Sequence, residues 1–223
     1  MKIFAVRIGT KYGIEYEEYL EDKLSKYEII WIREPYDPKV TLQWNKMWAM
    51  QQDIDEPICV MDIDVLLVND YEKIFEYPVE RGQFVAMPGW WRDTRKNNYV
   101  INGGFFKYYP KDCRYIYDKF VSDPDYWMEY YIKNGTTCGP VNGEQYFVED
   151  SVKEKLDLRF VPAEWMTRWE NLSYHDPEWL TDANIHYPGE YLYLGGEFNP
   201  HVRLLHFQGS NKPHSAIREV RGW

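Results

Sequence analysis

Largely apolar runs and helical patterns alternate along the first part of the chain. Residues 2–9 and 27–32 are runs of the length expected for buried strands. Between them, Tyr16, Leu20 and Leu24 follow one another at intervals of four, which places them on one face of a helix. The order strand, helix, strand with short connections predicts a sheet with parallel strands.

The rest of the chain continues this alternation. We predict further strands over residues 58–68, 84–89, 99–110, 158–165 and 202–209, and further helices over residues 41–52, 111–123 and 142–156. Thr41 and Asn142 are candidate N-caps of two of these helices. Residues 165–200 are rich in Trp, Tyr, Pro and Gly and have no clear period, which predicts long surface loops. We find no internal repeat and no linker, so a single domain over residues 1–223 is expected.

Composition excludes several classes of protein. The formal net charge is −10 and no Lys/Arg run stands out, so nucleic acid is not an expected partner. The three cysteines are an odd and widely spaced set, which indicates neither a disulfide framework nor a zinc site. The apolar part of the N-terminus is too short for a signal peptide or a membrane span, and no other stretch is long enough. A cytoplasmic protein without a membrane span is therefore expected.

Two aspartates interrupt the strand pattern of residues 58–68. Asp62 and Asp64 flank Ile63, and side chains two apart in a strand point to the same side. A bare charge at the end of a core strand costs several kcal/mol, so a cation should meet these carboxylates. At the carboxyl end of a strand both could reach one ion, and two hard oxygen donors suit Mg²⁺ or Mn²⁺. The alternative is a pair of turn aspartates that cap the next element.

The same motif is typical of two enzyme classes. An apolar strand that ends in D-x-D-x-T/V carries the nucleophile of haloacid-dehalogenase-like phosphatases, and "DIDV" fits that pattern. In those enzymes the motif usually lies on the first strand, whereas here about sixty residues of α/β pattern precede it. The second class is the metal-dependent glycosyltransferase of the GT-A type.

The C-terminal segment favours the second class. "LLHFQGSNKPH", residues 204–214, supplies His206 at the end of a predicted strand, followed by Gly209, Lys212 and Pro213. A neutral imidazole is a good ligand for Mn²⁺ beside two carboxylates. Glycine lets the backbone approach a phosphate closely, and lysine places a compact cation on the same segment. The combination H-x-x-G-x-x-K-P is much more specific than either residue alone.

With these motifs the chain resembles glycogenin and its relatives, glycosyltransferase family 8, whose tail motif reads H-F-x-G-x-x-K-P-W. The likeness extends in order from about residue 5 to 214. "RIGTKYG" resembles the first-strand loop that stacks on uracil, "WNKMWAM" the K-L helix, and "MDIDVLLV" the metal motif. "INGGFFKYYP" resembles N-S-G-V-x-x-x-x-P, which contacts the donor sugar, and "NGEQYFV" resembles D-Q-x-x-x-N.

The resemblance implies a single GT-A domain, with a mixed, mostly parallel central sheet flanked by helices. It assigns the metal to Asp62, Asp64 and His206, and catalysis to Glu144 and Lys46. The donor-binding residues that it implies are Ile8, Tyr12, Lys46, Asp62, Ile63, Asn102, Gly103, Gly104, Gln145, Gly209 and Lys212. Four positions depart from the family pattern: Glu144 replaces Asp, Gly103 replaces Ser, His214 replaces Trp, and Ile63 replaces Ala.

The implied reaction moves a hexose from UDP-glucose or UDP-galactose to a carbohydrate or other hydroxyl acceptor, with Mn²⁺ or Mg²⁺ as cofactor. The family retains the anomeric configuration, so the leaving phosphate oxygen can take the acceptor's proton. Tyr12 would stack on uracil, and Lys46 would reach the donor phosphate or sugar. Glu144 would stabilise the oxocarbenium-like charge or position the sugar.

Two other functions stay open on the sequence. One is the phosphatase described above, and the other is a non-catalytic module that binds a sugar or nucleotide. The acceptor site is expected in the stretch 165–200, where Trp165, Trp169, Tyr174 and Trp179 could stack on a sugar or form a small satellite core.

Overall fold

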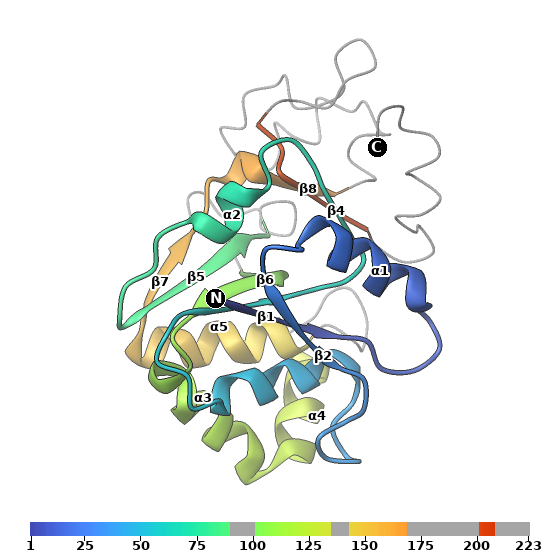
Figure 1. Cartoon of the computed structure of the whole chain (residues 1–223). Coiled ribbons are helices and arrows are strands. Elements are labelled where there is room, and N and C mark those ends of the chain that lie inside the picture. The colour runs from blue at the N-terminus through green and yellow to red at the C-terminus, as the bar shows by residue number, and fades with distance from the viewer. Residues whose placement is uncertain (90–100, 135–142, 169–200, 208–223) are drawn as a thin grey trace, which may run out of the picture. The chain divides into compact units, whose positions relative to one another are not determined.

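The structure, a computed structural model, describes residues 1–89, 101–134, 143–168 and 201–207 (Figure 1). The chain divides into two compact units. The first contains Met1–Ile63, Pro78–Ala86 and Ile101–Phe160, and the second contains Asp64–Tyr77, Met87–Val100 and Val161–Trp223. Among the described residues, no helix is long and apolar enough to cross a membrane.

A six-stranded sheet forms the centre of the first unit. Its strands are β1 (Lys2–Val6), β2 (Glu28–Ile32), β3 (Ile58–Met61), β5 (Gln83–Pro88), β6 (Ile101–Tyr108) and β7 (Asp157–Phe160), in the order β2-β1-β3-β6-β5-β7. Strand β1 is parallel to β2 and β3, and β5 is parallel to β7, whereas β3 and β6 are antiparallel. The predicted mixed, mostly parallel sheet is therefore confirmed.

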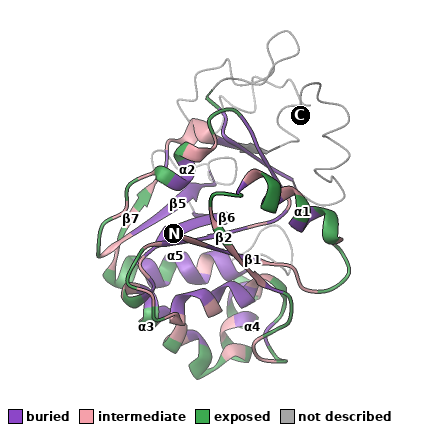
Figure 2. Cartoon of the chain, in the orientation of Figure 1, coloured by how far each residue is buried: buried purple, intermediate pink, exposed green. Residues whose placement is uncertain are grey.

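Helices cover both faces of this sheet. They are α1 (Ile14–Lys23), the 3₁₀ helix η1 (Leu42–Gln51), α3 (Pro110–Ser122), α4 (Pro124–Asn134) and α5 (Gly143–Lys155). Figure 1 shows α3, α4 and α5 together on one side of the sheet and α1 on the other. Strands β3 and β6, the two central strands in the sheet order, are buried along their whole length, and Figure 2 shows β6 in purple.

The main core lies between the sheet and the group formed by η1, α3, α4 and α5. Strand register aligns Phe4 with Val60, and Val60 with Phe106, so these side chains form one row on the same sheet face. On the helical side, Trp44 of η1 stacks on Phe120 of α3 with ring centroids 5.2 Å apart. Dense aromatic packing of this kind accounts for part of the chain's 18% aromatic content.

The first turn of α5 packs closely on α4. A Cβ on Gly143 would lie 2.8 Å from the Ile132 nitrogen and 2.9 Å from the Tyr131 carbonyl carbon, so a side chain at this position would push the two helices apart. This close approach fixes the start of α5 and therefore the position of the next residue, Glu144.

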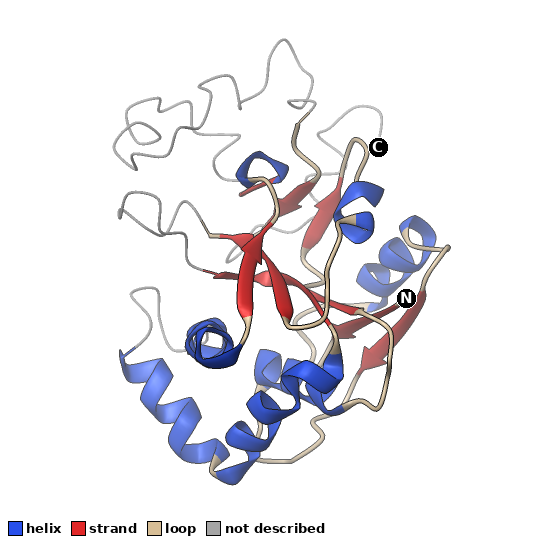
Figure 3. Cartoon of the chain, turned by 90° about the vertical axis from the view of Figure 1, so that its left-hand side faces the viewer, coloured by secondary structure: helices blue, strands red, loops and turns tan. Residues whose placement is uncertain are grey.

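A three-stranded sheet organises the described part of the second unit. Its strands are β4 (Val65–Leu67), β9 (Leu204–His206) and β8 (Met166–Arg168), in the order β4-β9-β8. Strand β9 is antiparallel to β4 and parallel to β8. The short helices α2 (Glu72–Glu76) and η3 (Ala163–Trp165) belong to the same unit. Figure 3 distinguishes the helices, in blue, from the strands, in red, along the described chain.

Several predicted elements differ in detail from the observed ones. The apolar run 58–68 forms two strands rather than one, because the chain leaves β3 after Met61 and starts β4 at Val65. The run 158–165 is strand only to Phe160, and Pro162, which has no N–H to donate, precedes the 3₁₀ turn. Segment 41–52 is helical, but it is a 3₁₀ helix. Thr41 makes no cap hydrogen bond, and its hydroxyl contacts the Met128 sulfur instead.

Other predictions are confirmed or fall outside the described residues. Tyr16, Leu20 and Leu24 are all buried, as the interval of four predicts. Cys59 and Cys113 are buried free cysteines, and burial raises the pKa of the Cys59 thiol to about 12. The candidate N-cap Asn142 lies outside the described residues. So does most of the predicted loop stretch 165–200, including Trp169, Tyr174 and Trp179. The fourth aromatic, Trp165, packs edge-on against Tyr77, as a small satellite core requires.

Candidate functional site

The pairing of β4 with β9 brings together two polar residues that are far apart in the sequence. Val65 is the register partner of His206, and the Phe207 N–H donates to the Asp64 carbonyl at 3.0 Å. The side chains of Asp64 and His206 therefore lie side by side, with Oδ1 and Nε2 3.9 Å apart. That separation is too long for a hydrogen bond. It fits two ligands of a common ion, since ligands about 2.1 Å from one ion are about 3 to 4 Å apart.

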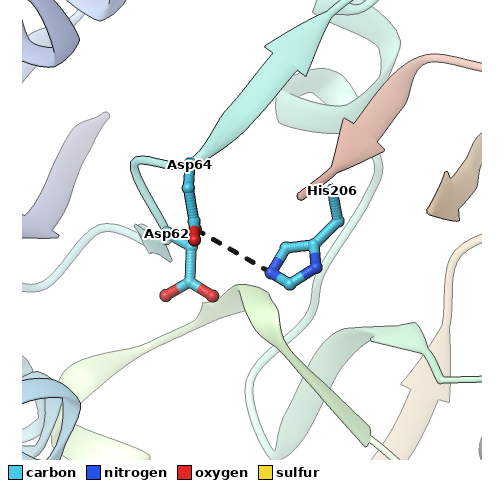
Figure 4. Close-up of side chains that lie close together, drawn as sticks. All are labelled: Asp62, Asp64 and His206. Carbon is cyan, nitrogen blue, oxygen red and sulfur yellow. Dashed lines mark ion pairs between the residues drawn. The ribbon is translucent and has the colours of Figure 1, made fainter. Parts of the chain in front are cut away.

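Asp62 is joined to Asp64 by Ile63 alone, so the chain itself keeps the two carboxylates near each other. Ligand atoms of Asp62, Asp64 and His206 all lie within 4.8 Å of one another (Figure 4). The set contains two carboxylates and one imidazole. Oxygen donors of this kind suit Mg²⁺ and Mn²⁺, and the imidazole nitrogen favours Mn²⁺ or another transition metal. The donor set thus fits the divalent ion that the sequence predicts.

Lys46 is a buried cation beside the first of these carboxylates. Its side chain is only 2% exposed, and its Nζ lies 2.6 Å from Asp62 Oδ1. Nζ also donates to the Gly103 carbonyl at 2.7 Å and lies 3.8 Å from Glu144 Oε1. An ammonium has three N–H donors, so these oxygens surround it well. The contacts join four segments of the first unit around one charge.

Strand β6 supplies the backbone of the same cluster. Asn102 is buried and its Oδ1 accepts the Gly104 N–H at 2.7 Å, while Gln145 Oε1 accepts the Gly103 N–H at 3.3 Å. A Cβ on Gly103 would stand 3.1 Å from Glu144 Oε2. Gly103 is thus a point of close approach, to which the structure brings Glu144 and Gln145.

The loop after β1 is held by a second buried ionic group. Glu17 is 2% exposed and accepts hydrogen bonds from Arg7 and from Arg33, whose Nη2 is 2.6 Å from Oε2. Burial by itself raises the pKa of Glu17, but the hydrogen bonds and charges of Arg33 and Arg7 outweigh it and lower the pKa below its usual value. Arg7 Nη1 also donates to the Tyr12 carbonyl at 3.4 Å, which ties this group to the loop.

Tyr12 and Ile8 are the two predicted donor residues on this loop. The Tyr12 ring is partly exposed, packs edge-on against Tyr16 and has the Lys11 ammonium 4.8 Å from its centroid. Ile8 is partly buried and packs against the main core, and Ile63 is buried. The two remaining predicted residues, Gly209 and Lys212, lie outside the described residues, as does His214.

Sequence reasoning missed the group formed by Arg7, Glu17 and Arg33. One signal was present, because Glu17 precedes Leu20 by three residues and therefore lies at the edge of the apolar face of α1. Reasoning also missed that Lys46 contacts Asp62, Gly103 and Glu144 together. Their spacing along the chain gave no signal of this assembly.

Comparison with family models gave no match, and comparison with curated protein sequences gave none either. Solved structures do match. The galactosyltransferase LgtC in complex with donor and acceptor sugar analogs has a TM-score of 0.58 at 14% identity, over 100% of this chain and 92% of that one. The apo glycosyltransferase GlyE of Streptococcus pneumoniae has a TM-score of 0.56 at 12% identity, over 95% and 55% of the chains. Apo mouse xyloside xylosyltransferase 1 has a TM-score of 0.50 at 13% identity, over 95% of this chain and 86% of that one.

The chain has the GT-A glycosyltransferase fold. At these identities the likeness establishes the fold and nothing finer. The predicted fold class is thereby confirmed, and the comparisons do not favour the phosphatase alternative. Membership of family 8 stays a prediction that its motifs carry.

Proposed function

We propose that this chain is a metal-dependent glycosyltransferase that moves a hexose from UDP-glucose or UDP-galactose to a hydroxyl acceptor, with retention of configuration. The observation that carries the proposal is the pairing of β4 with β9, which sets His206 beside Asp64 on a fold shared with glycosyltransferases. A spacing of 3.9 Å between these donors, next to Asp62, is what a shared divalent ion requires.

In this proposal Asp62, Asp64 and His206 hold Mn²⁺ or Mg²⁺. The bound ion supplies positive charge to the diphosphate as UDP leaves. Lys212 adds a second cation and Gly209 allows close backbone approach to the phosphates. Because these roles concern leaving-group charge, they act on the bond-breaking step rather than on recognition of the sugar.

The donor's base and sugar are assigned to other residues. Tyr12 offers a partly exposed aromatic face for uracil, in a loop that also contains Ile8. Asn102, Gly104 and Gln145 are placed with Gly103 at the end of β6 nearest Lys46, and we assign the donor sugar to them.

Glu144 is the acid assigned to the reacting centre. Its carboxylate is buried beside the Lys46 ammonium, and it lies in the first turn of α5, where the helix dipole favours a negative charge. A buried carboxylate in this place can stabilise positive charge on the sugar as the bond to UDP breaks. In a reaction with retention the leaving phosphate oxygen takes the acceptor's proton, so no separate base is required.

The test is turnover of a panel of UDP-sugars with Mn²⁺, with Mg²⁺ and with excess chelator. We expect UDP release from UDP-glucose or UDP-galactose only when metal is present. Phosphate release from a simple monoester would support the phosphatase alternative instead. Binding of a UDP-sugar without turnover, across a range of acceptors and in water, would support a non-catalytic module.

A further inference from the structure

Lys46 is more completely buried than is usual for a lysine that binds a ligand directly. The side chain is 2% exposed, and protein oxygens of Asp62 and Gly103 lie 2.6 and 2.7 Å from its Nζ. Burying an ammonium is unfavourable unless partners replace its water. These short contacts therefore fix where the ammonium stands, and through it where its carboxylate partners stand.

Glu144 is fixed by the same ammonium from the other side. Its carboxylate is 3% exposed, with Oε1 3.8 Å from Lys46 Nζ. Its other oxygen, Oε2, lies 3.1 Å from the point that a Gly103 Cβ would occupy. The carboxylate thus lies against the backbone of β6 at Gly103, which has no side chain. A side chain at position 103 would have to displace the carboxylate.

We propose that Lys46 is a positioning residue that sets the separation between Asp62 and Glu144. We further propose that position 103 is a glycine because the Glu144 carboxylate occupies the space that a side chain there would need. The proposal rests on the proposed function, in which Asp62 binds the ion and Glu144 acts on the sugar. It replaces the direct contact between Lys46 and the donor that the family resemblance implies. A catalytic pair held this way is preorganised, because moving either acid would break its contact with the buried Lys46 ammonium.

A double-mutant cycle with Lys46→Met and Glu144→Gln tests the coupling. K46M leaves a buried carboxylate without its cation, so the melting temperature of the metal-free protein should fall. E144Q removes that uncompensated charge, so K46M/E144Q should melt higher than K46M alone. Lys111→Met is the matched control, because Lys111 pairs with Asp53 and Asp55 at the surface and should tolerate the change.

Kinetics of the metal-loaded enzyme separate positioning from direct contact. We expect K46M and E144Q each to lower kcat, by about 100-fold, with little change in the KM for the donor. The double variant should be no slower than the slower single variant. A K46M effect that lies mainly in KM and adds to that of E144Q would overturn the proposal in favour of direct donor contact. A lowered melting temperature with unchanged kcat would overturn it in favour of a purely structural ion pair.

A milder variant covers the case in which K46M does not fold. Gly103→Ala adds only the Cβ that would stand 3.1 Å from Glu144 Oε2, and it should lower kcat by about 10-fold. In G103A/E144D the shorter acid leaves room for that Cβ, so the double variant should be no slower than E144D. An unchanged kcat in G103A would show that Glu144 does not work from this position.

Failure of the inference and failure of the proposed function give different results. If wild-type protein turns over no UDP-sugar, the proposed function fails, and the melting temperatures of the Lys46 and Glu144 variants still report on their coupling. If the wild type is active and the melting shifts are additive, only the inference is overturned.

Discussion

The two halves of the Asp62–Asp64 motif are held in different ways. Asp62 is bound by the buried Lys46 ammonium at 2.6 Å, within a cluster that includes Glu144 and the backbone of β6. Asp64 instead faces His206, with Oδ1 and Nε2 3.9 Å apart. The first half is closed by short protein contacts, whereas the second has the spacing of a pair that shares an ion.

The difference shows how one short motif can serve two purposes. A carboxylate has two oxygens and can accept bonds from more than one partner, so Asp62 can keep its contact to Lys46 and still offer a ligand atom. Asp64 and His206 depend on strand pairing for their position, since β4 and β9 meet through Val65 and His206. We expect changes in the first half to disturb stability and catalysis together, and changes in the second half to disturb metal binding and the turnover that depends on it, with stability unchanged.

The largest effect should come from changing Asp64 or its neighbour His206. Asp64→Asn and His206→Ala each take away one ligand, so Mn²⁺ binding should weaken strongly and donor turnover should fall by about 1,000-fold. The melting temperature of the metal-free protein should hardly change. Asp70→Asn is the matched control, since Asp70 is an exposed aspartate of the same unit that pairs with Lys73. Unchanged Mn²⁺ affinity in both ligand variants would show that the ion, if any, binds elsewhere.

A buried ionic group outside the proposed ligand set should affect stability and leave chemistry intact. Glu17→Gln removes the charge that Arg7 and Arg33 share, and because Arg33 is half exposed we expect a loss of about 2 kcal/mol in unfolding free energy. Denaturant unfolding measures it, with the exposed neighbour Glu18→Gln as control. A fall in kcat without a fall in stability would contradict this division of roles.

The pH dependence of unfolding sharpens the same test. The pKa of Glu17 is lowered in the folded protein, so its stabilisation is fully present above the unfolded value of about 4.5 and is lost as the pH falls through the folded pKa. Wild-type protein should therefore lose more stability than E17Q on acidification below about pH 4.5. If the unfolding free energies of the two proteins fell in parallel with pH, Glu17 would not be the source of the acid sensitivity.

The smallest effect is expected at Tyr12, in the loop after β1. Tyr12→Ala removes the proposed uracil platform, and loss of one stacking contact should raise the KM for the donor by about 10-fold while kcat stays close to wild type. Tyr126→Ala is the matched control, because Tyr126 is an exposed tyrosine on α4, 51% accessible. A change in kcat with KM unaltered would contradict a role in binding the base.

Much of the fold could be predicted from the sequence because its strands and α1 carry regular patterns. The interval between Tyr16, Leu20 and Leu24 predicts the buried face of α1, which the structure confirms. The break in the run 58–68 was harder to foresee. Apolar residues continue on both sides of Asp62 and Asp64, and only tertiary pairing assigns one side to β3 and the other to β4.

The site illustrates the same limit. His206 could be proposed from its motif, but its place beside Asp64 depends on strand register, which a sequence does not contain. The departures at Glu144 and Gly103 read separately as two irregularities in a family pattern. In the structure they belong together, because the longer acid reaches to within 3.1 Å of the point where a side chain at 103 would begin.

Mn²⁺ binding to the purified chain, measured together with UDP release from UDP-glucose and UDP-galactose, tests the central claim most directly. We predict one bound ion per chain in the wild type, much weaker Mn²⁺ binding in D64N and H206A, and sugar-donor turnover that chelator abolishes and Mn²⁺ restores. Turnover that persists in excess chelator, or undiminished Mn²⁺ binding in both variants, would contradict the account.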